Sequence, residues 1–323
     1  MTGNQTTWQR GVVTASTRAA DGIARIDVRT ERPVREDPGS HVDVRIGPGL
    51  VRSYSIVESD GASVTLGVRL SPTSRGGSAF MHTLAPGSAI DITAPLQDFP
   101  LRIGARRYLL LAGGIGITAI AGMARVLARL GADYTLVYVG RSRPAMAFLP
   151  ELTARHGDRL RVHIDDEGTP LDVGTLVADA DPDVELYMCG PIRLMDAVRR
   201  AWLAAELPLP NLRYETFGNS GWFDTEEFTV RVPRLGIETA VRTGDSLLEA
   251  LERAGAEVMS DCRKGECGLC TVGILDLRGA VDHRDVFFSD TQKARANTLC
   301  ACVSRVVRAR ADSGPGVLTL DIP

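Results

Sequence analysis

The segment SDCRKGECGLCT, residues 260–271, contains three cysteines in the spacing C-x4-C-x2-C, namely Cys262, Cys267 and Cys270. Two further cysteines follow at Cys300 and Cys302. This spacing is the plant-type pattern of thiolates around a [2Fe–2S] cluster, which needs four such ligands. Thiolates are the soft ligands that iron–sulfur clusters prefer, and the glycines between the cysteines allow a tight loop. The segment therefore predicts a small domain that folds around an iron–sulfur cluster and carries electrons.

Two other interpretations of these cysteines are a structural zinc site and a disulfide framework. Zinc sites usually contain paired C-x2-C units, and this segment contains a single one. Disulfide frameworks are typical of small secreted domains, whereas this chain has 323 residues and gathers five of its six cysteines within residues 262–302. The spacing favours the iron–sulfur cluster over both.

The composition is that of an ordinary globular protein, with 44% apolar and 24% charged residues. The length indicates two or three domains. The formal net charge of −3 gives no general attraction to nucleic acid or to an anionic membrane. The N-terminus lacks a basic segment followed by an apolar core, and no apolar run is long enough to span a bilayer. We expect a cytoplasmic protein that binds neither nucleic acid nor membrane.

Residues 1–103 are dominated by short runs in which apolar and polar residues alternate, separated by Gly, Pro and Asp turns. Examples are residues 22–29, 41–45 and 63–69. A period of two indicates antiparallel strands, and about six such strands predict a small β-barrel. One helix is expected near residues 78–84.

Two stretches of this predicted barrel contain candidate binding residues. The first is RSYS, residues 52–55, where Arg52 and Tyr54 share one face of a strand and Ser55 lies on the other. The second is RGGS, residues 75–78, whose glycines open the expected helix and leave backbone N–H groups able to hold a phosphate. Taken alone, each is more typical of a surface row or a plain turn than of a binding site.

Residues 104–222 alternate between strands and helices. The apolar run at 107–112 predicts a strand buried on both faces, and the GGIGIT turn at 113–118 leads from it into a helix. The CGP turn at 189–191 likewise ends a strand and opens a helix, although Cys189 alone is more typical of an inert buried thiol. This pattern predicts a parallel α/β domain, whose ligands bind beyond the carboxyl ends of the strands. GGIGIT is not the G-x-G-x-x-G fingerprint, so the turn alone does not establish nucleotide binding.

Residues 223–323 contain the cysteine segment. A hairpin is expected at 228–241, a helix at 246–254 and a closing strand at 317–322. We predict a small α+β domain in which a mixed sheet wraps the cluster. The predicted fold is therefore multidomain, with an antiparallel β-barrel at 1–103, a parallel α/β domain at 104–222 and an α+β, β-grasp-like domain at 223–323.

These motifs, in this order, resemble those of the phthalate dioxygenase reductase and vanillate O-demethylase reductase family. Its members are similar to ferredoxin-NADP reductases and carry a ferredoxin domain at the C-terminus. The matching motifs are Arg-x-Tyr-Ser, Gly-Gly-Ile-Gly-Ile-Thr, Cys-Gly-Pro, C-x4-C-G-x-C and Cys-Val-Ser-Arg, and they cover almost the whole chain. The resemblance implies FMN in the barrel, NADH at the α/β domain and a plant-type [2Fe–2S] cluster in the C-terminal domain. The choice of FMN over FAD is an inference from the family.

The resemblance also implies roles for individual residues. In the flavin site these are Arg52, Tyr54 (against the isoalloxazine), Ser55 (near its reactive nitrogen), and Arg75, Gly76, Gly77 and Ser78 (around the phosphate). In the nicotinamide nucleotide site they are Gly113, Gly114, Gly116, Thr118, Cys189, Gly190 and Pro191, together with Phe217, which matches an aromatic residue that covers the flavin in relatives. The implied cluster ligands are Cys262, Cys267, Cys270 and Cys302. The candidate catalytic residues are Ser55 and Thr118, which would hydrogen-bond the flavin, and Phe217, which would move aside for the nicotinamide.

Two points stay open in the sequence. The loop length favours Cys300 as the fourth cluster ligand, whereas the adjoining Val-Ser-Arg favours Cys302; we prefer Cys302 because contiguous matches constrain register better than a loop length does. The two arginines of GRSR, residues 140–143, follow a strand and would suit the 2′-phosphate of NADPH, although the family usually uses NADH. NADH is therefore the expected donor and NADPH the alternative. A further family segment, DHRD at 282–285, predicts an ion pair that fixes a loop.

The implied function is that of a reductase component that passes electrons from NADH through FMN and the cluster, one at a time, to another protein. The sequence has no haem, Rieske or mononuclear-iron motif of its own, so the acceptor is external. The resemblance implies a terminal oxygenase of the Rieske non-haem iron type. A cytochrome P450 partner and a stand-alone flavin or ferredoxin reductase are the alternatives. A non-enzymatic alternative is a ferredoxin-like carrier or redox sensor that binds nucleotides without turnover. We expect a monomer.

Overall fold

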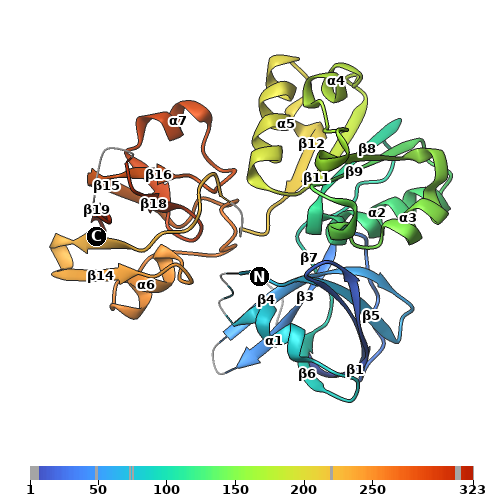
Figure 1. The fold of residues 1–323 in the computed structure, drawn as a ribbon, viewed down its shortest axis with the longest axis horizontal. Coiled ribbons are helices and arrows are strands. Elements are labelled where there is room, and N and C mark those ends of the chain that lie inside the picture. Colours follow the sequence, from blue (N-terminus) through green and yellow to red (C-terminus); the bar gives the residue numbers. More distant parts are fainter. Residues whose placement is uncertain are drawn as a thin grey trace, which may run out of the picture. The chain divides into compact units, whose positions relative to one another are not determined.

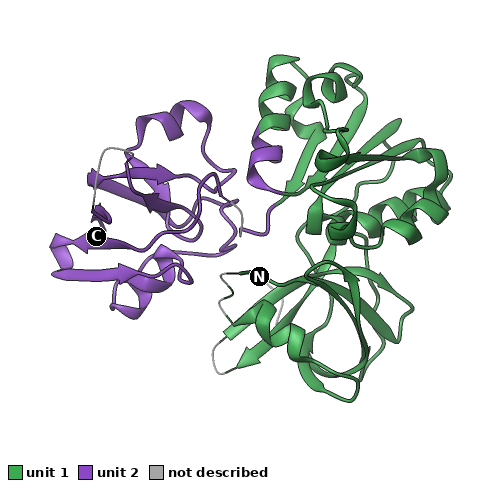
Figure 2. Ribbon diagram, in the orientation of Figure 1, with its two compact units in different colours: residues 1–190, 197–215 green, residues 191–196, 216–323 purple. Residues whose placement is uncertain are grey.

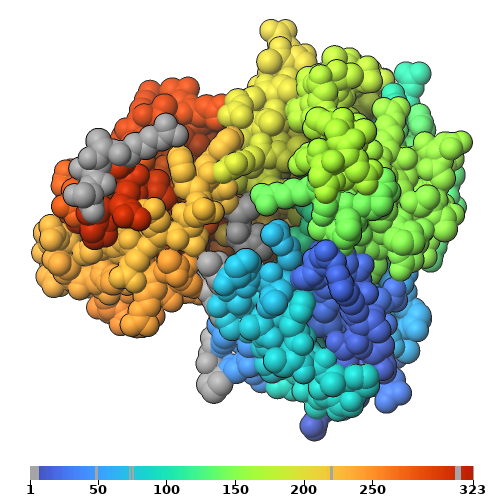
Figure 3. All heavy atoms as spheres, in the orientation of Figure 1, coloured from blue at the N-terminus to red at the C-terminus, as the bar shows by residue number. Residues whose placement is uncertain are grey.

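The computed structural model describes residues 7–47, 50–72, 74, 76–218, 221–309 and 314–322. The chain forms two compact units, shown in two colours in Figure 2. Unit 1 comprises Met1–Gly190 and Ala197–Glu215, and unit 2 comprises Pro191–Asp196 and Thr216–Pro323. In the space-filling view the C-terminal residues, orange to red, form a closely packed body of their own (Figure 3). The predicted domain boundaries at 103/104 and 222/223 stay predictions.

The first sheet of unit 1 is a closed antiparallel barrel (Figure 1). Its elements are β1 (Trp8–Ala20), β2 (Ile23–Thr30), β3 (Ser40–Gly47), β4 (Leu50–Ser59), β5 (Ser63–Arg69), α1 (Gly77–Thr83), β6 (Ala89–Thr93) and β7 (Leu96–Gln97). The strand order is β4-β5-β2-β1-β6-β3-β7, and β4 also pairs with β3, so six strands close on themselves. Inward-facing residues such as Ile26, Val42 and Leu66 are completely buried and fill the barrel.

The second sheet of unit 1 is parallel and has helices packed beside it. The strands are β8 (Arg107–Gly113), β9 (Tyr134–Gly140), β10 (Leu160–Ile164), β11 (Val184–Cys189) and β12 (Leu212–Glu215). The helices are α2 (Ile117–Arg129), α3 (Leu149–His156), α4 (Val173–Ala178) and α5 (Ile192–Ala204), with 3-10 turns η1 (Gly114–Gly116), η2 (Arg143–Ala145), η3 (Gly157–Arg159), η4 (Asp165–Glu167) and η5 (Leu209–Asn211). Residues 192–196 of α5 belong to unit 2. The order β10-β9-β8-β11-β12 reverses direction between β8 and β11. In an open α/β sheet such a switch point opens a crevice beyond the strand ends, where ligands bind.

Unit 2 contains a mixed five-stranded sheet and a two-stranded ribbon. The large sheet has the order β14-β13-β19-β15-β17, and the β13–β19 pair is its parallel pair. Its elements are β13 (Phe228–Val232), η6 (Pro233–Leu235), β14 (Ile237–Val241), α6 (Leu247–Arg253), β15 (Thr271–Arg278), β17 (Thr298–Cys300) and β19 (Gly316–Asp321), with α7 (Asp290–Arg295) and the ribbon β16 (Ala280–Asp282) and β18 (Arg305–Val307). Helix α6 begins with a capping box in which Ser246 and Glu249 satisfy each other's backbone N–H groups.

The barrel, the parallel sheet and the mixed sheet with its helix confirm the predicted fold class. The predicted hairpin, the helix α6 and the closing strand β19 of unit 2 are also confirmed. Helices α3 and α4 were not predicted because eight and six residues are too few for a clear helical period. None of the described helices has the length and apolar character needed to span a bilayer.

Candidate functional site

The barrel strand β4 carries the predicted flavin residues, and α1 lies directly against them. Ser55 is 7% exposed, and Arg52 and Tyr54 are half-buried. A Cβ atom on Gly77 would lie 2.7 Å from Cγ of Arg52 and 3.2 Å from the Tyr54 hydroxyl oxygen. Burial raises the pKa of the Tyr54 phenol, and the Arg52 guanidinium only partly offsets this, so the ring stays neutral. The structure thus brings Arg52, Tyr54 and Gly77 together, with room at position 77 for backbone alone.

The turn into α1 is fixed by hydroxyl groups. Gly76 has a φ of 88°, which favours glycine. The Ser78 hydroxyl accepts a hydrogen bond from the Ser71 N–H at 3.1 Å and donates to the Ser74 hydroxyl at 3.0 Å. Arg75 lies outside the described residues. Within residues 76–78 of the predicted phosphate turn, Gly76 sets the backbone direction and Ser78 joins the turn to Ser71 and Ser74.

Thr118 connects the α/β domain to the barrel. Its hydroxyl donates to the Ile115 carbonyl at 2.9 Å, and the side chain is 2% exposed. A Cβ atom on Gly67 of strand β5 would lie 2.7 Å from the Thr118 methyl group, so the two elements pack in direct contact. The hydroxyl proton is thus committed to the Ile115 carbonyl, while the hydroxyl oxygen keeps its capacity to accept a hydrogen bond from a ligand.

The carboxyl ends of β8 and β11 form the nucleotide edge, which we define as residues 113–118 and 189–190. These strands are parallel neighbours, with Ala112 opposite Cys189. A Cβ atom on Gly116 would collide with the Cys189 carbonyl and lie 2.9 Å from the Gly190 nitrogen. Gly114 has a φ of 54°. Gly116 is therefore required by the close approach of two backbone turns at the switch point, and Gly114 by its positive φ. A pyrophosphate could approach the backbone N–H groups there.

The cysteine segment forms a loop, residues 262–270, that we call the cluster loop. Gly265 and Gly268 have φ values of 78° and 74°, which lets the loop turn tightly. The N–H groups of Lys264 and Cys267 both donate to the Cys262 sulfur at 3.4 Å. Such donors stabilise the negative charge of a thiolate ligand.

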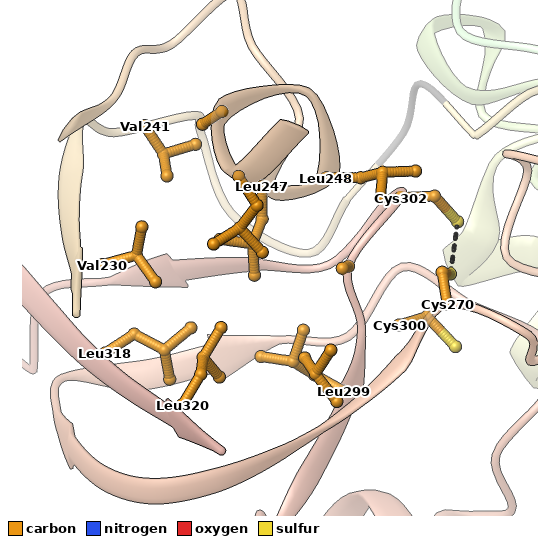
Figure 4. Packing of buried hydrophobic residues seen from close by; sticks show 14 of the residues in the cluster. Val230, Val241, Leu247, Leu248, Cys270, Leu299, Cys300, Cys302, Leu318 and Leu320 are labelled. Carbon is orange, nitrogen blue, oxygen red and sulfur yellow. Dashed lines mark hydrogen bonds between the residues drawn. The ribbon is translucent and has the colours of Figure 1, made fainter. Parts of the chain in front are cut away.

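The sulfur atoms of the predicted ligands lie in two pairs. The thiols of Cys262 and Cys267 share a hydrogen bond, and those of Cys270 and Cys302 lie 3.1 Å apart (Figure 4). The described side chains do not converge on a single-ion site of three or more ligands. Two thiolate pairs instead match a two-iron cluster, in which each iron takes two protein ligands.

Cys300 and Cys302 differ in what surrounds them. Hydrogen bonds from both thiols lower the pKa of Cys270 to about 3, and the same contacts, followed by burial, raise the pKa of Cys300 and of Cys302. Both thiols therefore contact Cys270 of the cluster loop, and Cys302 also interacts with the Gly265 N–H and with Cys262. Cys300 is fully buried, and the negative charge of Asp285 contributes to its raised pKa.

A buried ionic network supports the cluster loop. Asp282 and Arg284 form the predicted loop-fixing ion pair at 2.6 Å, and Arg284 also donates to the Phe223 carbonyl at 3.0 Å. Asp285 is completely buried and accepts hydrogen bonds from the N–H of Phe288 and the hydroxyl of Ser304. The adjoining Val286 N–H donates to the Gly265 carbonyl at 3.0 Å. The network therefore fixes the middle of the cluster loop through the backbone.

Sequence reasoning missed a second anchor of this loop. The Thr216 N–H donates to the Glu266 carboxylate and the Thr216 hydroxyl donates to the Lys264 carbonyl, both at 2.7 Å. These bonds tie the segment that carries Phe217 to the cluster loop within unit 2. Phe217 itself is half-buried. Pro191 and Phe217 belong to unit 2, whereas the other predicted flavin and nucleotide residues belong to unit 1.

Comparison with known proteins identifies a family for part of unit 2 and relatives along most of the chain. Residues 230–307 match the 2Fe-2S iron-sulfur cluster binding domain family. The chain is 36% identical to phenoxybenzoate dioxygenase subunit beta of Ectopseudomonas oleovorans, over 94% of each chain. It is 34% identical to vanillate O-demethylase oxidoreductase of a Pseudomonas strain, over 84% of this chain and 88% of the relative.

Two solved structures extend the comparison. Phthalate dioxygenase reductase, described as a modular structure for electron transfer from pyridine nucleotides to [2Fe-2S], is 29% identical with a TM-score of 0.71 over 98% of each chain. An intact type IV self-sufficient cytochrome P450 monooxygenase is 36% identical with a TM-score of 0.65. That match covers 98% of this chain but 41% of the P450 protein, so the present chain spans about two fifths of its length.

Proposed function

This chain belongs to the phthalate dioxygenase reductase and vanillate O-demethylase reductase family, and we propose that it delivers electrons from NADH to a separate Rieske-type oxygenase. One observation carries this proposal: the chain matches an oxygenase subunit over 94% of both lengths, so the family's redox modules are present together. Further relatives are named as reductase subunits of toluene-4-sulfonate and carnitine monooxygenase systems. The chain is accordingly the reductase component of a multicomponent oxygenase system. The names of these relatives refer to phenoxybenzoate, toluene-4-sulfonate, carnitine and vanillate.

FMN fits the surface formed by β4 and α1. Tyr54 and Ser55 would hold the isoalloxazine, while Arg52 and the turn from Gly76 to Ser78 would hold the phosphate. The glycine at position 77 supports this assignment, because any larger residue would push into Arg52 and Tyr54. When bound, FMN supplies the conversion of a two-electron hydride into single electrons, and the [2Fe–2S] cluster supplies a one-electron carrier.

NADH fits the nucleotide edge. Gly113, Gly114 and Gly116 would let the pyrophosphate approach the backbone, and Cys189, Gly190 and Pro191 would border the nicotinamide. Thr118 would act on the flavin by accepting a hydrogen bond from it, because its own proton is donated to the Ile115 carbonyl. Phe217 would cover the flavin until the nicotinamide displaces it, and the burial of Thr118 and Cys189 would exclude water from the site of hydride transfer.

The two sulfur pairs, Cys262 with Cys267 and Cys270 with Cys302, would hold the cluster. The contacts of Cys302 with the Gly265 N–H and with Cys262, in addition to Cys270, support Cys302 as the fourth ligand. The backbone N–H groups of Lys264 and Cys267 would stabilise the thiolate charge of Cys262.

A cytochrome P450 acceptor is the second candidate. The observation that favours it is the 36% identity to part of a self-sufficient P450 monooxygenase, a protein that also contains its own P450. We prefer the separate Rieske oxygenase because the relatives matched over most of their own length include a dioxygenase subunit and an O-demethylase oxidoreductase. The six free cysteines suit a reducing compartment, and we place the protein in the cytoplasm as a monomer.

The test compares two acceptors under anaerobic conditions. Purified reductase in catalytic amount is mixed with NADH and either a panel of Rieske oxygenases of the vanillate demethylase and carnitine monooxygenase types or a panel of bacterial P450 proteins. We expect reduction of a Rieske centre, recorded by EPR, and no ferrous carbon monoxide complex of a P450. Reduction of P450 proteins alone would contradict the proposal. The Cys302→Ser variant is the control, because it should reduce ferricyanide but neither protein acceptor.

A further inference from the structure

Two loops leave the parallel sheet of unit 1 next to the nucleotide edge. Strands β9 and β10 are parallel neighbours, and Gly140 at the end of β9 lies opposite Ile164 at the end of β10. The loops that follow, residues 141–143 and 165–167, therefore leave the same edge of the sheet. Strand β9 is also the neighbour of β8, which carries the glycine turn.

In nucleotide-binding α/β domains, residues at this position contact a particular part of the bound nucleotide. The residues that follow the strand next to the glycine turn address the ribose of the adenosine half. An acidic side chain there suits the free 2′-hydroxyl of NADH, whereas an arginine suits the 2′-phosphate of NADPH. Arg141 and Arg143 would therefore select NADPH if both guanidinium groups were available.

The structure shows that Arg143 is already engaged. Its Nε donates to Glu167 Oε1 at 2.8 Å and its terminal nitrogen donates to Oε2 at 2.6 Å, a bidentate pair between the two loops. The loops are also joined through the backbone, because the Asp166 N–H donates to the Arg141 carbonyl at 3.0 Å. The loop 165–167 carries three carboxylates against two guanidinium groups in 141–143, so a phosphate dianion would meet a net negative surface.

We propose that Glu167 is a specificity-determining residue, which makes the protein select NADH by occupying Arg143 and repelling the 2′-phosphate of NADPH. This inference rests on the proposed NADH site. It explains why a chain with arginines after the second strand of the sheet can belong to an NADH-using family. Exposed ion pairs contribute little to folding stability, so the effect of this pair is expected in ligand choice and not in stability.

The test measures the ratio of kcat/KM for NADPH to that for NADH, with ferricyanide as acceptor, in the intact flavoprotein. We expect Glu167→Gln to raise this ratio about threefold to tenfold, because it frees Arg143 and removes one negative charge. The double variant Glu167→Gln/Arg143→Gln should lose most of that gain. A matched control is Asp183→Asn, which removes the exposed partner of Arg106 at 3.5 Å, near the starts of β8 and β11. This control should leave the ratio unchanged.

A binding measurement separates this inference from the proposed function. Calorimetric titration with 2′,5′-ADP and with 5′-AMP should show that Glu167→Gln tightens 2′,5′-ADP selectively. An unchanged ratio and unchanged 2′,5′-ADP affinity would overturn the role of Glu167, as would an equal gain in Asp183→Asn. A wild-type flavoprotein that oxidises neither nucleotide would overturn the proposed function instead, and the titration would still report on the ion pair.

Discussion

The nucleotide edge and the cluster loop would each position a redox group, but they depend on different features of the chain. At the nucleotide edge the decisive feature is missing side chains, because Gly116 allows one backbone turn to pack against Cys189 and Gly190. At the cluster loop the decisive features are side chains, namely the paired cysteines and the buried carboxylates of Asp282 and Asp285. The first site should therefore be sensitive to added volume, and the second to the loss of a sulfur or a charge.

The largest expected effect is at the fourth cluster ligand. Cys302→Ser should lose most of its iron and acid-labile sulfide, because one thiolate of the Cys270 pair is removed, and should fall well below the about two irons per chain of a full cluster. Cys300→Ser is the matched control and should keep the cluster. Iron and sulfide analysis with EPR of the dithionite-reduced protein measures both. The opposite pattern would assign Cys300 as the ligand.

The next effect is at the nucleotide edge. Gly116→Ala should destabilise unit 1 by about 1–3 kcal/mol and weaken NADH binding, because its methyl group has no space beside the Cys189 carbonyl. Stopped-flow reduction of the flavin at varied NADH concentration and urea unfolding measure the two consequences. Gly47→Ala is the control, since a Cβ there would meet none of the described, non-neighbouring residues within 4 Å. Equal behaviour of the two variants would refute the close-approach argument.

A smaller effect is expected where Thr216 meets the cluster loop. Thr216→Val removes the hydroxyl that donates to the Lys264 carbonyl, a hydrogen bond of about 1 kcal/mol. The cluster should form, but its reduction by NADH should be severalfold slower because the segment carrying Phe217 is less well fixed. Rapid-freeze EPR follows this rate, and Thr239→Val on strand β14 serves as the control. Normal cluster reduction in Thr216→Val would show that the anchor has no part in electron transfer.

The smallest expected effect is a difference between the two units in how their stability depends on pH. In unit 1, burial and then the charges of Arg155 and Arg159 lower the pKa of His156 below its ordinary value of 6.5. Its Nδ1 lies 2.6 Å from the Tyr134 hydroxyl oxygen. The unfolded chain therefore binds this proton more readily than the folded chain, so the stability of unit 1 should fall as the pH drops below 6.5.

Unit 2 should respond at lower pH. Burial raises the pKa of Asp285, but three neighbours outweigh it: His283, whose Nδ1 lies 3.4 Å from Asp285 Oδ1, the charge of Lys293 and the Phe288 N–H. The pKa therefore lies below its ordinary value of 3.8. The stability that Asp285 contributes is present above this value and is lost only as the pH falls through the lowered pKa. Hydrogen exchange at pH 7.5 and 5.5, corrected for intrinsic rates, should show increased opening around His156 and little change around Asp285. The variant His156→Gln should remove the change in unit 1.

The same contrast explains what the sequence could predict. The barrel, the parallel sheet, the glycine turns and the cysteine loop follow from local periodicity, turn residues and spacing, and the fold class is confirmed. Strands β16 and β18 were missed because three residues carry no periodic signal. The anchors Thr216 and Glu266, and the pair Arg143–Glu167, join residues far apart in the sequence through side chains. Such contacts leave no local pattern, whereas the Asp282–Arg284 pair could be predicted because its residues are two positions apart.

The central claim is that one chain carries a complete path from NADH to a [2Fe–2S] cluster. An anaerobic titration of the purified protein with NADH, followed by visible absorbance and low-temperature EPR with flavin and iron quantified, tests it most directly. We predict about one flavin and about two irons per chain, bleaching on addition of NADH and a rhombic [2Fe–2S] signal. Reduction of the flavin with no cluster signal in iron-replete protein would contradict the account and leave a flavin reductase without an electron-transferring cluster.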